Sequence, residues 1–272
     1  MTEATPDSDL QVRRFESERI HASSKVLLLA AIGLALWGIG RLLSGSAQPV
    51  QLPPLGAILL VIAIVLHVDH LTFRLGRTAV VLIVLGAVIN GVGSLLFFLR
   101  VDSSAYLSCY GFSFLLGGVG VAMVAVHKER QLTTTVEEYA QGIPYRAQVT
   151  VHASFLSLVT AASGLVLYGF GLFATTNSTN RNPYILMCGG AILVAIGIVS
   201  HVEHLIPRVG LPAVIAGVVA PILFAVAWIP DALNPANIAS RLIAPGTFLG
   251  IGALLGALAC VLALLKKRST DS

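Results

Sequence analysis

The chain has 272 residues, of which 56% are hydrophobic and only 11% are charged, and its mean hydropathy is +0.87. About a quarter of the residues of an ordinary soluble domain are charged, so the composition excludes such a domain and predicts an integral membrane protein in contact with the lipid bilayer. The formal net charge of +4 does not indicate nucleic acid, because the basic residues flank apolar segments and act as topology signals.

Taken in chain order, polar and apolar segments alternate in a regular way. Residues 1–19 predict a mobile cytoplasmic tail, 128–149 a cytoplasmic linker with the breaker cluster Gly142-Ile143-Pro144, and 266–272 a basic tail. Eight apolar runs approach the roughly 20 residues that cross a hydrocarbon core. They lie at 24–43, 55–71, 78–99, 105–126, 152–174, 184–202, 210–229 and 243–265. The sequence therefore predicts an all-α integral membrane protein with eight transmembrane helices.

The second half of the chain repeats motifs of the first half. Ile20-His21-Ala22-Ser23 returns 131 residues later as Val151-His152-Ala153-Ser154, and the glycine-rich run 33–40 returns as 164–171. His67-Val68-Asp69-His70-Leu71 returns after 134 residues as His201-Val202-Glu203-His204-Leu205. Because each half has an even number of spans, both halves enter the membrane in the same orientation. We expect two tandem four-helix repeats, 20–127 and 150–265, related by a pseudo-two-fold axis along the membrane normal.

The basic residues predict which side of the membrane holds the termini. Cytoplasmic segments carry an excess of Lys and Arg, and all but four of the 17 basic residues lie on the side of the termini. The four exceptions are Arg41, Arg100, Arg181 and Arg241. Both termini are therefore expected in the cytoplasm, with a plasma or inner membrane as the location.

The three cysteines, Cys109, Cys188 and Cys260, all lie inside predicted spans. They show no Cys-x-x-Cys spacing, and small apolar packing residues are the favoured interpretation. Cys109 and Cys188 both lie toward the non-cytoplasmic leaflet, which leaves a disulfide between them open.

All seven histidines map to the cytoplasmic side, and six of them recur in the repeats. Spans joined by a short loop are antiparallel neighbours, so each repeat can gather three histidines at one depth. Imidazole suits a transition metal or haem as a ligand. Helical spacing directs the nearby carboxylates away from both histidines of their own helix, so we expect each carboxylate to hydrogen-bond a ligand histidine rather than to bind the metal. The candidate ligands are His21, His67, His70, His152, His201 and His204, and the carboxylates expected to hydrogen-bond them are Asp69 and Glu203.

A structural interpretation of the same motif is somewhat stronger. Histidines and an arginine in the last turn of a helix favour the negative end of its dipole, and Gly76 or Gly210 supplies a turn with positive φ. The His-x-carboxylate-His segments then cap a helix at the membrane interface. His21 and His152 lie near helix starts, where a cation gains nothing from the dipole, and they keep the ligand interpretation open.

No catalytic motif stands out in the chain. It contains no Gly-x-Ser-x-Gly elbow, phosphate-binding loop or paired-carboxylate site. The sequence favours a non-catalytic accessory or scaffold membrane protein, with protein partners in the membrane. The alternatives are a metal- or haem-binding protein that uses the histidines, and a transporter or permease with a pathway between the repeats.

Overall fold

The computed structural model describes residues 22–43, 51–140, 153–175, 182–201, 205–233 and 240–271. Within these ranges the regular structure is entirely helical. The long helices are α2 (Ser24–Leu43), α3 (Leu52–Leu75), α4 (Arg77–Phe98), α5 (Ser103–Ala140), α6 (Phe155–Thr175), α7 (Asn182–Val199), α9 (Leu211–Ala227) and α11 (Ser240–Asp271). Two short helices, α8 (Ile206–Val209) and α10 (Ile229–Leu233), flank α9.

Within the described residues, most of each apolar run predicted from the sequence coincides with one of the long helices. In the described part of the chain, six helices are long and apolar enough to cross a membrane, namely α2, α4, α5 as far as Gln131, α6, α7 and α11 from Gly246 to Ser269. The apolar stretches Leu52–His67 and Leu211–Ala227 are shorter. Large apolar side chains such as Leu66, Val81 and Leu156 are more than half exposed. Such a surface suits lipid rather than water, and the fold is that of a multi-pass integral membrane protein.

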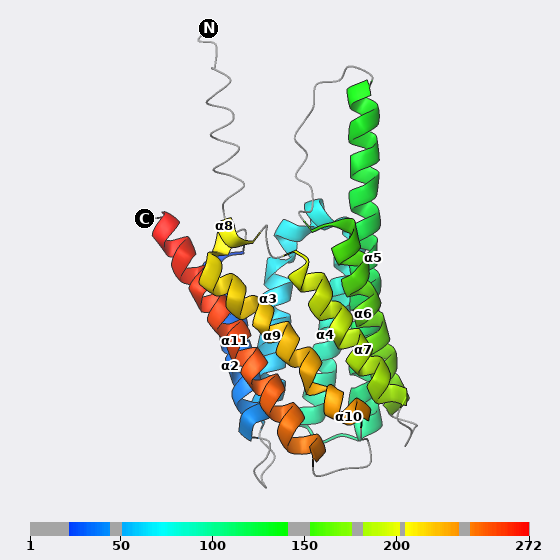
Figure 1. Ribbon diagram of the computed structural model, residues 1–272, viewed down its shortest axis with the longest axis vertical. Helices are drawn as coiled ribbons and strands as arrows, with labels where there is room; N and C mark the ends of the chain where they lie inside the picture. Colours follow the sequence, from blue (N-terminus) through cyan, green and yellow to red (C-terminus); the bar gives the residue numbers. More distant parts are fainter. Residues whose placement is uncertain are drawn as a thin grey trace.

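The long helices form one closed ring. Each packs against the next along the chain, and α11 returns to pack against α2 (Figure 1). Between the two predicted repeats, α2 packs extensively against α11, and α5 packs extensively against α6. The two halves are therefore joined along two seams, α5 with α6 and α11 with α2.

Glycines let the helices within each half cross at backbone distance. A Cβ atom added to Gly33 would lie 2.9 Å from the carbonyl oxygen of Gly56 on α3. The residues at the repeated positions, Gly164 on α6 and Gly190 on α7, make the same contact, with a Cβ on Gly164 only 2.6 Å from the Gly190 oxygen. Close backbone approach strengthens helix packing where lipid removes the hydrophobic drive between helices.

The two seams also rest on glycine contacts at repeated positions. A Cβ on Gly38 would lie 2.8 Å from the carbonyl oxygen of Gly250, across the seam between α2 and α11. A Cβ on Gly169 would lie 2.8 Å from the carbonyl oxygen of Gly111, across the seam between α6 and α5. The same device thus closes the ring on both sides.

Two glycines make the sharp turns that precede α4 and α9. Gly76 has φ 86° and Gly210 has φ 84°, a conformation that L-residues with a side chain rarely adopt. This confirms the positive φ predicted for both residues. Each turn reverses the chain within a few residues, so consecutive helices lie side by side.

Two helices extend into segments that the sequence analysis assigns to a linker and a tail. α5 continues to Ala140 and projects beyond the other helices (Figure 1), and α11 continues to Asp271. The predicted tail 1–19 and linker residues 141–149 lie outside the described residues.

Candidate functional site

One end of the ring collects the repeated polar motifs. We call this end the rim; it comprises the starts of α2, α4, α6 and α9 and the ends of α3, α5, α7 and α11. Of the six histidines predicted as ligands, the side chains of His67 and His201 are described, and both are half-buried at equivalent positions of the two halves. His70 lies on α3, while His21, His152 and His204 fall outside the described residues, as does Glu203. Among the described side chains, no group of three or more His, Cys, Asp or Glu residues is placed to hold a metal ion.

The repeated serines of the rim cap the first helix of each half. The Ser23 hydroxyl oxygen accepts a hydrogen bond of 3.3 Å from the backbone N–H of Val26. The Ser154 hydroxyl oxygen accepts one of 3.0 Å from the N–H of Ser157. Each serine satisfies one of the backbone donors that a helix start leaves without an intrahelical partner. The third residue of the His-Ala-Ser motif therefore has a structural role in both halves.

The repeated alanines of the same motif anchor a lysine from the other half. The Lys128 ammonium, on α5, donates a hydrogen bond of 2.5 Å to the carbonyl oxygen of Ala153, just before α6. The Lys267 ammonium, on α11, donates one of 2.7 Å to the carbonyl oxygen of Ala22, just before α2. We call these two bonds the lysine clasps. Each clasp ties the end of one half to the start of the other at a seam of the ring.

The second half adds a chain of serine hydroxyls that the first half lacks. The Ser157 hydroxyl lies 2.6 Å from that of Ser154 and 2.8 Å from that of Ser200, the residue after α7. The Ser200 hydroxyl in turn donates a hydrogen bond of 3.1 Å to the Gly197 carbonyl oxygen. The positions equivalent to Ser157 and Ser200 in the first half are Val26 and Leu66. The sequence analysis missed this chain, because isolated serines in an apolar helix give no pattern.

His127 supports the turn between α3 and α4. A Cβ atom on Gly76 would lie 3.0 Å from Cγ of the His127 ring, so the ring packs directly against the glycine. The ring Nε2 lies 3.0 Å from Nε2 of Gln131, one turn further along α5. His127 is thus a packing residue of the rim.

At the other end, which we call the far end, aromatic side chains meet across the interior of the ring. The Tyr168 ring on α6 is buried, and its centroid lies 4.8 Å from that of Phe114, 5.6 Å from that of Phe224 and 5.7 Å from that of Trp228. Helix α6 packs on α5 and α7, whereas Phe224 and Trp228 belong to α9 and its C-cap. Tyr168 therefore reaches past its neighbouring helices into the interior.

Arg41 enters the same interior from the opposite side. Its guanidinium lies 4.9 Å from the ring centroid of Trp37, and it lies within electrostatic range of Tyr110 on α5 and Tyr168 on α6. Because α2 packs on α3 and α11, only a side chain directed into the ring can approach α5 and α6. The charge pattern predicts a role for Arg41 in topology but does not predict its inward direction. A sequence signal for this contact exists, because Arg41 follows Trp37 by one helical turn and a cation at that spacing can lie over the indole ring.

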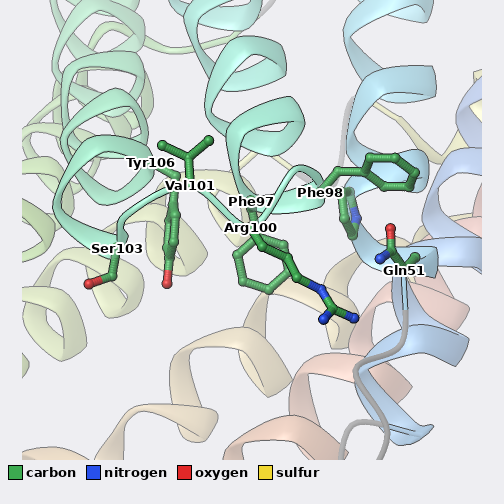
Figure 2. Close-up of a pocket in the computed structure, with 8 residues that line it drawn as sticks. Gln51, Phe97, Phe98, Arg100, Val101, Ser103 and Tyr106 are labelled. Carbon is green, nitrogen blue, oxygen red and sulfur yellow. The ribbon is translucent and has the colours of Figure 1, made fainter.

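A shallow cavity of about 380 Å³ also opens at the far end, where α3 and α5 begin and α4 ends. Figure 2 shows Arg100 extending across it toward the side where Gln51 lies. Arg100 has φ 58°, and its N–H donates to the Phe97 carbonyl while that of Val101 donates to the Leu96 carbonyl, as in a Schellman motif. The lining is mostly apolar and open, so this cavity is a surface hollow beside the helix end.

The chain matches no known family model, no curated protein and no solved structure.

Proposed function

We propose that the protein is an eight-span membrane protein of two tandem four-helix repeats, and that it serves as a non-catalytic accessory or scaffold subunit. The observation that carries this proposal is the use made of the repeated motif at the rim. Ser23 and Ser154 cap helices, and the carbonyl groups of Ala22 and Ala153 receive the lysine clasps. A motif whose repeated residues hold helix ends together supports a structural role.

The order of helices around the ring supports eight spans rather than six. Helix α3 has 24 residues and α9 has 17, which at 1.5 Å per residue correspond to about 36 Å and about 26 Å, near the roughly 30 Å of a hydrocarbon core. Both pack between helices that are long enough to cross. If either helix stayed outside the bilayer, its two neighbours could not pack along it.

The repeated contacts support two halves of like orientation. Gly33 with Gly56 and Gly164 with Gly190 make the same crossing, and the two lysine clasps link the halves in the same sense. The distribution of the basic residues supports a cytoplasmic rim, with a plasma or inner membrane as the location. A reporter fused after Ser272 is expected to be cytoplasmic and one inserted after Asn177 to be external; any other combination contradicts the topology.

The transporter alternative gains little from this geometry. A pathway that separated the two repeats would open along a seam, and both seams contain backbone contacts at glycines. Separating them would break the Gly38–Gly250 or the Gly111–Gly169 contact together with a lysine clasp.

A spectrum and a metal analysis distinguish the scaffold from the histidine site. The scaffold proposal expects a folded, monodisperse preparation without visible absorption or stoichiometric metal. A Soret band or a bound metal that disappears in His67→Ala and His201→Ala variants would establish the alternative, a metal or haem site with His21, His70, His152 and His204 as further ligands. Crosslinking in native membranes provides the positive test of the scaffold: a discrete complex with another membrane protein is expected, and monomer alone contradicts an accessory role.

A further inference from the structure

Arg41 is a cation inside the ring without an acidic partner. It makes no ion pair with any described residue, and its recorded interactions are with the Trp37 ring and with the tyrosines Tyr110 and Tyr168. The Arg41 side chain keeps an exposed surface, as expected of a group that lines an opening. An ionised group in a membrane span is costly, and such groups usually line a functional pathway or pair with an opposite charge.

A second donor in the same interior lacks an acceptor. The indole Nε1 of Trp228 is buried and has no hydrogen-bond partner among the described residues. Trp228 packs on Tyr168, with ring centroids 5.7 Å apart, so this N–H belongs to the aromatic cluster near Arg41. Indole and guanidinium groups can only donate. A buried donor without an acceptor costs about 1–3 kcal/mol.

The described surroundings of Arg41 supply mainly apolar area. Phe114, Phe224 and Tyr168 present aromatic faces, and the Tyr110 hydroxyl already donates to Ser94 at 3.3 Å. No carboxylate acts on Arg41 among the described side chains, and the carboxylate of Asp102, at the same end, accepts a hydrogen bond from the backbone N–H of Ser104. An interior with donors in excess and an aromatic wall suits a ligand that combines an anionic acceptor with an apolar body.

We propose that the interior at the far end binds a carboxylate carried on an apolar or aromatic body, with Arg41 as the charge partner and Trp228 Nε1–H as a further donor. A single planar guanidinium matches a carboxylate through two parallel hydrogen bonds. A phosphate normally requires several cations or backbone N–H groups, and none besides Arg41 lies in the described cluster. This site is independent of the scaffold proposal.

Because the two halves carry different side chains at the equivalent positions, we expect one such site in each chain. The position equivalent to Arg41 in the second half is Leu172, which is buried in the apolar core, and the position equivalent to Trp228 in the first half is Ser94. The second half therefore supplies the indole donor and most of the aromatic wall, and the first half supplies the charge. A stoichiometry of one ligand per chain follows.

The chain has two tryptophans, Trp37 beside Arg41 and Trp228 beside Tyr168, so intrinsic fluorescence reports on the site directly. The experiment titrates the purified full-length protein with phenylacetate, with its neutral analogue phenylacetamide, and with phenylphosphonate. The variants are Arg41→Gln, Arg41→Lys and the matched control Arg100→Gln, which removes a different arginine at the same end. Thermal melting of each variant verifies folding.

Phenylacetate is expected to give a saturable change at one equivalent, with affinity at least about tenfold above that of phenylacetamide. Arg41→Gln should weaken it about tenfold or more, Arg41→Lys less, and Arg100→Gln less than about twofold. Equal responses to acid and amide, or an unchanged response in a folded Arg41→Gln variant, would overturn the proposal. Tighter binding of phenylphosphonate would overturn the carboxylate assignment. If Arg41→Gln does not fold, the acid and amide titrations of the unaltered protein decide the question.

Discussion

The rim and the interior at the far end use repeated positions in opposite ways. At the rim, Ser23 and Ser154 make the same cap, and Lys128 and Lys267 make the same clasp. In the interior, Trp37 corresponds to Tyr168, Arg41 to Leu172 and Ser94 to Trp228. The contacts that close the ring are kept in both halves, whereas the side chains that fill it differ. Binding chemistry can therefore arise in the interior without loss of the frame.

The largest expected effect comes from filling a backbone crossing of the frame. A Cβ on Gly190 would lie 2.6 Å from both the Gly164 carbonyl oxygen and the Tyr168 backbone nitrogen, whereas one on the adjacent Gly189 would meet nothing within 4 Å. Gly190→Ala should cost about 3 kcal/mol or more because backbone cannot move aside. Gly189→Ala should lie within about 1 kcal/mol of the parent, on the stabilising side. Unfolding in mixed micelles measures both; similar values would mean that the crossing does not limit stability.

The second prediction compares the helix caps of the two halves. Ser23→Ala should cost about 1 kcal/mol, the usual loss for an N-cap. Ser154→Ala should cost more, about 2 kcal/mol, because it also removes a partner from the chain of Ser157 and Ser200. The same unfolding measurement orders the variants. The reverse order would show that the serine chain adds nothing to the cap.

The third prediction breaks the lysine clasps one at a time. Lys128→Met and Lys267→Met should each cost about 1 kcal/mol, since each leaves one carbonyl without its donor and keeps most of the stem packing. Lys25→Met is the matched control, because Lys25 is exposed at the same rim and has the same charge. Its effect should be near zero. A cost equal to that of the clasp variants would point to net charge rather than to the hydrogen bonds.

The smallest effect is expected from a cap at the far end that the other half lacks. Hydrogen bonds from the Ser104 hydroxyl and backbone N–H lower the pKa of Asp102 from its ordinary value of 3.8. The position 139 residues on is Arg241, so the second half has no equivalent carboxylate. A lowered pKa means that this contribution to stability is present above pH 3.8 and is lost as the pH falls through the pKa of the folded protein. Asp102→Asn should therefore reduce the drop in melting temperature between pH 5 and pH 3, and an unchanged drop would contradict the role.

Local rules were sufficient for several elements of the fold. Hydropathy located each long helix to within a few residues except where α5 and α11 run on beyond the apolar stretch, because a helix end is set by its last hydrogen bonds and not by polarity. Gly76 and Gly210 were predictable because a positive φ is a local demand on a single residue. The repetition of Ser23 and Ser154 is apparent in the sequence, but their role as helix caps is not, since a cap is defined by the hydrogen bond that it makes.

The sequence by itself determined that the chain is apolar and helical and that its halves carry the same motifs, because these properties depend on composition and on spacing along the chain. Only the tertiary structure decided that the helices close into one ring rather than two bundles, since closure depends on which faces approach. It also decided that Arg41 points inward to Tyr110 and Tyr168. Direction on a helix is relative to its neighbours, and those neighbours are remote in sequence.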